Sequence, residues 1–182
     1  LEIWSAESGR FATVEVHDSA VSDRSGAAEL FMPSDFDANE GTASLDEAGG
    51  GGESFTVPTV TLDEQFAGDE IGVLKIDIEG HEKAALEGAA DLLRNRAIRD
   101  VVYEDHGGYP SPVSELLEGH GYRVWLIRKG LLKPLLIPPG TKPYELPNYL
   151  ATTDSERAAR RMRAFGYRVL SGSLRSNCER SG

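Results

Sequence analysis

The sequence has little cysteine, little lysine and no long apolar run. Its 182 residues include one cysteine, Cys178, so no disulfide can close within the chain, and a reducing, cytoplasmic setting is the simplest interpretation. The 19 Lys and Arg residues oppose 30 Asp and Glu residues, a formal net charge of -11. This charge disfavours nucleic acid and anionic membranes as partners and favours basic partners or neutral small molecules. No segment approaches the ~20 apolar residues that span a bilayer, and no signal-peptide pattern opens the chain.

The residues that are present suffice for one domain. With 40% apolar residues the chain can bury a single sizeable core, and we expect one domain over residues 1–182. Residues 34–54 are acidic, rich in glycine and without periodicity, which predicts a flexible loop. Residues 154–182 are expected to form a short helix, capped by Asp154 or Ser155, and a tail. The chain starts without Met in the middle of a pattern, so we expect it to be the back part of something longer.

Three short strands are predicted before residue 63. Alternating apolar residues indicate a strand over 13–21, and "DRSGAAELFMP" at 23–33 indicates a turn into a second strand. "FTVPTVTL" at 55–62 indicates a third strand. Because Pro58 lacks an N–H, we expect this third strand at the edge of a sheet, where no ladder partner needs that donor.

From residue 71 the pattern becomes a regular alternation of strands and helices. Periodicity predicts strand, helix, strand, helix and strand over 71–77, 81–95, 98–105, 111–121 and 122–128, and a last strand over 148–153 after a Pro-rich loop. Such alternation implies parallel strands joined by helical crossovers, hence an α/β sheet covered on its faces. The first helix carries one apolar stripe, made by Ala85, Leu86, Ala89, Leu92 and Leu93. In the second, Ser111 is the expected N-cap and Pro112 the first helical residue.

Ionisable residues follow these strands, at the carboxyl ends where open α/β sheets bind ligands. Asp77 ends a strand with apolar neighbours, where an unpaired carboxylate is costly, so we expect a partner or ligand to offset its burial. The candidate residues at the three strand ends are Ser22 and Asp23, then Asp77, Glu79 and His81, then Glu104, Asp105 and His106.

Other ionisable residues have simpler explanations. Glu82 suits the dipole of a helix N-terminus, and His17 and His120 are expected to be structural. The arginines near the C-terminus suggest a solvated helix face rather than a phosphate or nucleic-acid site; they are Arg157, Arg160, Arg161 and Arg163.

Five motifs follow one another in the chain: "DSAVSDRSGAAELFMPS", "VPTVTLDE", "VLKIDIEGHEKAALEGAADLL", "VVYEDH" and "LLEGHGYRVWLI". In order and spacing, over roughly residues 13–153, they resemble the FkbM family of S-adenosylmethionine-dependent methyltransferases. The resemblance implies a class I methyltransferase fold, which is Rossmann-like, with S-adenosylmethionine as cofactor. The implied activity is methyl transfer to a hydroxyl of a sugar, polyketide or similar metabolite.

The resemblance also assigns roles to the strand-end residues. Ser22, Asp23 and Asp77 match positions on the cofactor side, and Glu104 and His106 lie on the substrate side. Methyl transfer requires an aligned acceptor oxygen that loses its proton, so His81 or Asp77 is the expected base. We favour His81 as base, with Asp77 and Glu79 orienting the acceptor. Alternatively, Asp77, Glu79, Glu104 and His106 gather around a Mg²⁺ ion that polarises the acceptor hydroxyl.

Two features of the family are missing from the sequence. No glycine-rich cofactor turn precedes residue 13, and no acid follows a second strand to hold the ribose; "GGGG" at 49–52 lies in an acidic loop. In the family's sheet order the two missing strands lie between the strands at 13–21 and 73–76, so we expect an open strand edge. A catalytically inactive domain that acts as an interaction module is therefore the alternative. A phosphate-binding or nucleotide-sugar enzyme of related fold is disfavoured, because acids stand where phosphates would bind.

Overall fold

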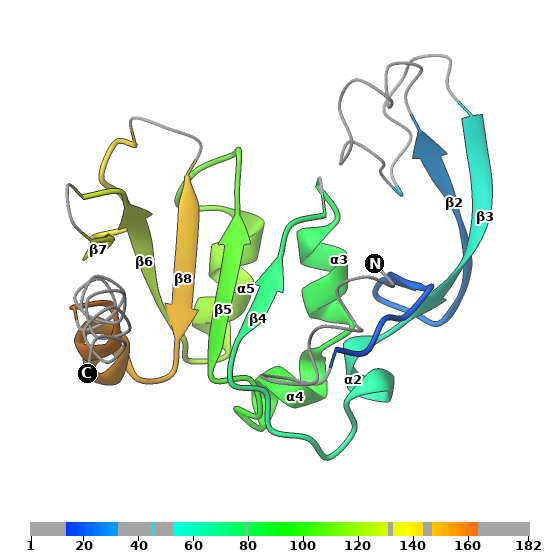
Figure 1. The fold of residues 1–182 in the computed structure, drawn as a ribbon, viewed down its shortest axis with the longest axis horizontal. Coiled ribbons are helices and arrows are strands. Elements are labelled where there is room, and N and C mark those ends of the chain that lie inside the picture. Colours follow the sequence, from blue (N-terminus) through cyan, green and yellow to red (C-terminus); the bar gives the residue numbers. More distant parts are fainter. Residues whose placement is uncertain are drawn as a thin grey trace, which may run out of the picture.

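The computed structural model describes residues 14–32, 45, 53–78, 80–130, 133–143 and 147–163. Their strands form two separate sheets, a five-stranded sheet and a three-stranded sheet. Figure 1 shows the larger sheet on the left and the long β2–β3 ribbon of the smaller sheet on the right, with helices between and behind them. The fold is therefore mixed α/β, as the sequence predicts.

The five-stranded sheet has the order β4-β5-β8-β6-β7. Its strands are β4 (Leu74–Ile76), β5 (Asp100–Glu104), β6 (Arg123–Arg128), β7 (Leu135–Ile137) and β8 (Asn148–Thr152). Strand β4 is parallel to β5, and β8 is antiparallel to both β5 and β6. The carboxyl ends of β4, β5 and β6 consequently share one edge, the upper edge in Figure 1, which we call the carboxyl edge.

The three-stranded sheet has the order β1-β3-β2 and consists of β1 (Ala20–Val21), β2 (Gly26–Met32) and β3 (Glu53–Val60). Two expectations are wrong here. The strand expected over 13–21 keeps only the two residues of β1, and β3 is the central strand rather than an edge. Pro58 is nonetheless accommodated, because β1 pairs only with Thr59 and Val60 and leaves the rest of that side of β3 open.

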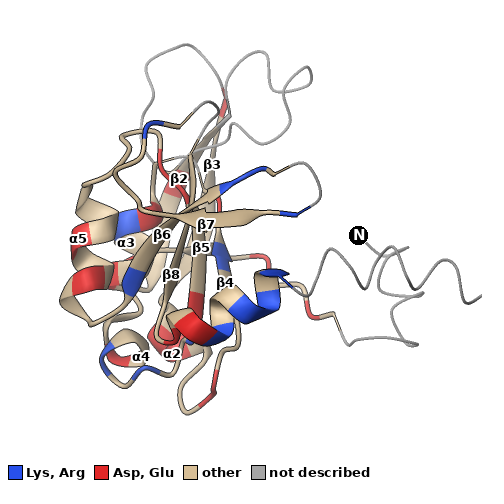
Figure 2. Ribbon diagram, turned by 90° about the vertical axis from the view of Figure 1, so that its left-hand side faces the viewer, with Lys and Arg blue, Asp and Glu red and all other residues tan. Residues whose placement is uncertain are grey.

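Helices α2 (Leu62–Gln65), α3 (Glu82–Glu87), α4 (Ala90–Arg94) and α5 (Pro112–Gly119) connect the strands. Figure 2 shows α3 and α5 on one side of the five-stranded sheet and the helical residues 155–163 on the other. The single helix expected over 81–95 is instead two helices. The carboxylate of Asp63 accepts hydrogen bonds from the backbone N–H groups of Asp91 and Leu92, both at 2.9 Å, and so caps α4 from another element.

The predicted apolar stripe of this region faces the core. Its five residues are at most 5% exposed. They pack with the inner residues of the sheet, among which Tyr103 and Tyr149 stack at 5.5 Å between ring centroids. The predicted start of α5 is also confirmed: Ser111 is its N-cap, in a reciprocal capping box with Ser114, and Pro112 follows. The 3.6-residue period and the cap residues are local signals, which is why the sequence predicts both.

The two segments expected to be irregular lie mostly outside the described residues. Of 34–54, Glu53 and Ser54 belong to β3. Asp154 caps the terminal helix as predicted, because its Oδ1 accepts from the backbone N–H of Arg157 at 2.9 Å. Strand β7 lies where a Pro-rich loop was expected. In the described part of the chain, every helix is too short or too polar to cross a membrane.

One of the terminal arginines is not on a solvated face. Arg157 Nη2 lies 2.5 and 2.6 Å from the two carboxylate oxygens of Asp100, which is 5% exposed. Thr152 Oγ1 donates to the same carboxylate at 2.7 Å. The expectation of a solvated arginine face is therefore wrong for Arg157, whose partner is 57 residues away and invisible to local patterns.

Candidate active site

A cavity of about 510 Å³ opens at the carboxyl edge, beyond β4 and β5. We call it the acidic pocket, because four carboxylates and one ammonium group line it. Its lining residues are Asp77, Gly80, Glu82, Lys83, Glu104, Asp105, His106, Gly107, Pro112 and Val113. The volume is in the range of small-molecule sites. The structure thus brings together four of the candidate strand-end residues, Asp77, Glu104, Asp105 and His106.

His106 and Glu104 form a pair inside this pocket. His106 Nε2 lies 3.2 Å from Glu104 Oε1, and the side chain of His106 is 61% exposed whereas that of Glu104 is 22% exposed. A carboxylate at this distance favours a proton on Nε2. The Nδ1 atom of His106 has no hydrogen-bond partner in the described part of the chain, so it is available to accept a proton from a ligand.

Two buried oxygen atoms near the pocket lack partners. Asp105 accepts a hydrogen bond from the backbone N–H of Gly107 at 2.9 Å through Oδ1, but its buried Oδ2 atom and the buried hydroxyl of Tyr103 have no partner among the described residues. Burial, and next the carboxylate of Asp105, raise the pKa of Tyr103, so the hydroxyl keeps its proton. Unsatisfied buried polar atoms are costly, and a bound ligand or water that reaches them would offset that cost.

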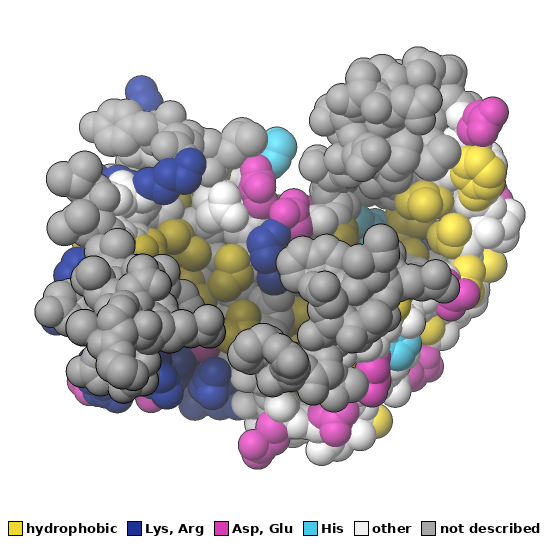
Figure 3. All heavy atoms as spheres, in the orientation of Figure 1, with side chains coloured by type: hydrophobic (Ala, Val, Ile, Leu, Met, Phe, Trp, Pro, Cys, Tyr) yellow, Lys and Arg dark blue, Asp and Glu magenta, His cyan; other side chains and the backbone are white. Residues whose placement is uncertain are grey.

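Asp77 is more exposed than the sequence predicts. Its side chain is 50% exposed and forms an ion pair with Lys75, so the expected burial is wrong, although it does have a partner. The reason is the alternation of side chains along the strand. Asp77 points to the same face as the exposed Lys75, whereas Ile76 between them points to the core and is 4% exposed. Figure 3 shows acidic and basic side chains together at the surface near the middle of the molecule.

Ser22, Asp23 and His81 gather at a second place, where the end of β1 meets α3. Ser22 is 6% exposed, its Oγ lies 3.0 Å from His81 Nε2, and it donates to Asp23 Oδ1 at 3.0 Å. Because the Ser22 hydroxyl donates its hydrogen bond to Asp23, its oxygen can accept one from His81. In that arrangement His81 Nε2 carries a proton and its hydrogen bond to Ser22 holds the Ser22–Asp23 turn. His81 does not line the acidic pocket.

Gly88 makes this junction possible. A Cβ atom on Gly88 would lie 2.1 Å from the backbone carbonyl oxygen of Ser22. The backbone of Gly88 is ordinary helical, with φ -71, so only the close approach requires glycine.

Replacing Gly88 by alanine is expected to lower the free energy of unfolding by about 1–3 kcal/mol, because the β1 end must move away from α3. Urea denaturation followed by circular dichroism measures this. The matched control is Gly119→Ala in α5, where a Cβ meets nothing within 4 Å, and where alanine should stabilise by about 0.5–1 kcal/mol. Equal stability of the two variants would show that Ser22 does not pack on Gly88.

The remaining predictions concern Glu79 and a metal. Glu79 lies outside the described residues. Within them, no three His, Cys, Asp or Glu side chains are placed to hold a metal ion. Mg²⁺ binding and the role of Glu79 therefore stay predictions.

Sequence reasoning missed some contributors to the site. Tyr103 is hidden in a run of strand residues, and its proximity to Asp105 follows from the fold. Lys83 lies outside the apolar stripe of its helix, yet it lines the pocket and pairs with Glu87 at 2.5 Å. The only local signal for Tyr103 is its position directly before Glu104, an acid at the end of the strand.

Residues 10–124 match the family model of the FkbM methyltransferase domain. The chain belongs to this family. It is 35% identical over 91 residues to AglP, a hexuronic acid methyltransferase of Haloferax volcanii, and the match covers 48% of this chain and 35% of that protein. The chain thus spans about a third of the length of this curated relative. No solved structure matches the chain.

Proposed function

We propose that the chain functions in an S-adenosylmethionine-dependent O-methyltransferase, which methylates a hydroxyl on a sugar or secondary metabolite. The observation that carries the proposal is the acidic pocket at the carboxyl edge, with the His106–Glu104 pair inside it, in a chain of the FkbM family. The name of AglP, a hexuronic acid methyltransferase, supports a sugar as the acceptor.

The described residues fit the cofactor by charge. S-adenosylmethionine brings an activated methyl group on a sulfonium, together with an amino group and ribose hydroxyls. Carboxylates are suitable acceptors for such groups, and Asp77 and Asp23 present them beyond β4 and β1. Ser22 adds a hydroxyl beside Asp23. We propose that these three residues bind the cofactor and that His81 positions the Ser22–Asp23 turn through its Nε2 contact.

The acceptor hydroxyl is proposed to bind in the acidic pocket. His106 Nδ1 takes the proton of that hydroxyl, and Glu104 orients the ring and stabilises the positive charge that forms on it. Asp77, which lines the same pocket, aligns the acceptor. His81 as the base stays a prediction from the sequence, and comparing His81 and His106 variants separates the two assignments.

The strand order supports a class I, Rossmann-like architecture as part of the same proposal. In such sheets, helical crossovers connect parallel strands and an antiparallel strand lies near one end. Strands β4, β5 and β6 run in one direction, and β8 is inserted antiparallel between β5 and β6. The open outer side of β4 is where the family's sheet order places the strands that carry the glycine turn.

Calorimetric titration with S-adenosylmethionine tests the proposal. The Asp77→Asn variant keeps the size of the side chain and removes its charge, so its affinity is expected to be about tenfold weaker than that of the unmodified chain. Asp69→Asn, an exposed acid in the loop before β4, is the matched control and should bind like the unmodified chain. Identical affinities of the Asp77 and Asp69 variants would exclude Asp77 from the cofactor site.

A second function is supported by the exposed edge of β4. Val73, just before this strand, is 58% exposed, and no described strand pairs with the outer side of β4. An open edge is a template for another strand, so an inactive module that binds a partner by strand addition is the alternative. Concentration-dependent association without any binding of S-adenosylmethionine would favour it.

A further inference from the structure

The carboxyl edge is divided by charge. Acids line its part beyond β4 and β5, whereas cations follow β6 and precede β7. Figure 3 shows acidic side chains and a histidine near the middle of this edge and basic side chains toward the β6–β7 end. Residues 119–144 contain five Lys and Arg residues and no Asp or Glu, although acids outnumber cations 30 to 19 over the whole chain. The local charge is therefore opposite to the overall charge.

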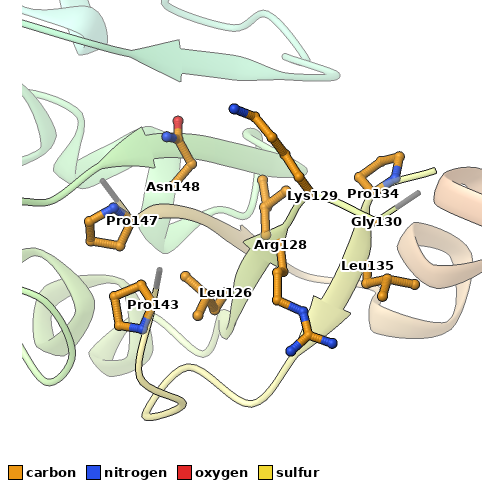
Figure 4. A pocket seen from close by; sticks show the side chains of 10 residues that line it. Leu126, Arg128, Lys129, Gly130, Pro134, Leu135, Pro143, Pro147 and Asn148 are labelled. Carbon is orange, nitrogen blue, oxygen red and sulfur yellow. The ribbon is translucent and has the colours of Figure 1, made fainter. Parts of the chain in front are cut away.

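A second cavity, also of about 510 Å³, lies at this basic end. We call it the basic pocket. Apolar side chains form much of its wall, and Arg128 and Lys129 are the charged groups among the described lining residues; these are Leu126, Ile127, Arg128, Lys129, Gly130, Pro134, Leu135, Pro143, Pro147 and Asn148. Figure 4 shows Lys129 and Asn148 extending to one side of β6 and Arg128 to the other, beside Leu126 and Leu135. Cations thus approach an apolar wall from both faces of the strand.

Arg128 is not neutralised within the described part of the chain. It is exposed, and none of the described acids lies within ion-pair distance of it. By contrast, Lys75, Lys83 and Arg157 each pair with a carboxylate. A guanidinium beside an apolar wall recognises carboxylate and phosphate groups in a bidentate way, which lysine does not.

The two pockets adjoin each other along the sheet. Asn148, at the start of β8, is opposite Glu104 of the acidic pocket in one ladder and opposite Ile127 of the basic pocket in the other. Two strand spacings separate Glu104 from Ile127, roughly 10 Å. One ligand of modest size therefore reaches both pockets.

We propose that the methyl acceptor is anionic, with its carboxylate or phosphate bound by Arg128 in the basic pocket while its hydroxyl lies in the acidic pocket. The inference rests on the proposed function and names its class of substrate. An anionic acceptor differs from the neutral or basic partner that the overall charge of -11 favours. Arg128 determines the specificity, because an uncharged acceptor gains nothing from it.

Equilibrium binding without cofactor tests this with three probes that share an aromatic ring, which suits the apolar wall. They are p-nitrophenyl glucuronide (a carboxylate), p-nitrophenyl glucoside 6-phosphate and the neutral p-nitrophenyl glucoside, all of which carry sugar hydroxyls. We expect the glucuronide or the phosphate to bind more tightly than the glucoside, and the stronger of the two identifies the anion. Arg128→Gln should weaken the binding of that probe about tenfold and leave the affinity for the glucoside unchanged. Arg123→Gln, at the opposite end of β6, is the matched control and should change nothing.

Two results would overturn the inference. One is equal binding of the charged and neutral probes, and the other is an Arg128→Gln variant that binds like Arg123→Gln. A separate assay of methyl transfer shows which of the two proposals has failed, the anionic acceptor or the methyltransferase function. Transfer to the glucoside as fast as to the anionic probe that binds more tightly overturns the anionic acceptor alone. Charge-selective binding that depends on Arg128, without transfer from S-adenosylmethionine to any probe, overturns the proposed function and leaves only an anion-binding pocket.

Discussion

Replacing His106 by glutamine is expected to lower the turnover of methyl transfer by roughly 10²- to 10⁴-fold, the usual contribution of a general base. Glutamine keeps a polar side chain at a 61% exposed position, so folding should not change. The affinity for S-adenosylmethionine should also stay the same, because His106 lies with Glu104 on the acceptor side. Initial rates with a labelled methyl group, together with a cofactor titration, measure both quantities.

Two further variants make this result specific. His17→Gln changes an exposed histidine outside the pocket and should have the activity of the unmodified chain. His81→Gln should weaken cofactor binding more than it lowers turnover, since His81 holds Ser22 at 3.0 Å. If His81→Gln instead lost turnover at unchanged cofactor affinity while His106→Gln remained active, the base would be His81, as the sequence alone suggests.

Replacing Arg157 by alanine is expected to lower the free energy of unfolding by about 3 kcal/mol. The carboxylate of Asp100 is 5% exposed and would keep the hydrogen bond from Thr152 and the ion pair with Arg99 at 3.3 Å. The buried charge would then be only partly compensated, which places the cost at the low end of that for breaking a buried pair. Urea denaturation at neutral pH measures the change.

Two controls show which partner matters. Arg160→Ala removes an exposed arginine whose nearest carboxylate oxygen is 4.0 Å away, and it should cost at most about 0.5 kcal/mol. Asp100→Asn should cost less than Arg157→Ala, because the side chain of Arg157 is 22% exposed and regains water. An Arg157 variant as stable as the Arg160 variant would mean that Asp100 is not anchored by this pair.

Local signals in the sequence predict local structure well in this chain. The apolar period at 85–93 and the Ser111–Pro112 start are formed by neighbouring residues, and both are confirmed. The break between α3 and α4 depends on Asp63, and the central place of β3 depends on where β1 lies. These features involve distant partners, so no local pattern reveals them.

In the candidate site, too, some features follow from local signals and others from distant partners. Strand-end acids at Asp77 and Glu104 predict a pocket at the carboxyl edge, because strand direction alone brings such residues together. The exposure of Asp77 follows instead from its place on the same face of the strand as its ion-pair partner Lys75. The separation of His81 from the acidic pocket follows from its contact with Ser22, 59 residues away. Assigning roles to individual residues therefore required the fold.

NMR mapping of S-adenosylhomocysteine on the isotope-labelled chain decides whether the strand ends at Ser22, Asp23 and Asp77 form the cofactor site. We predict that amide signals of Ser22, Asp23 and Asp77 shift on titration, and that those of residues 155–163, on the other side of the sheet, do not. Shifts confined to residues 155–163, or no shift at saturating ligand, would contradict a methyltransferase site at this edge.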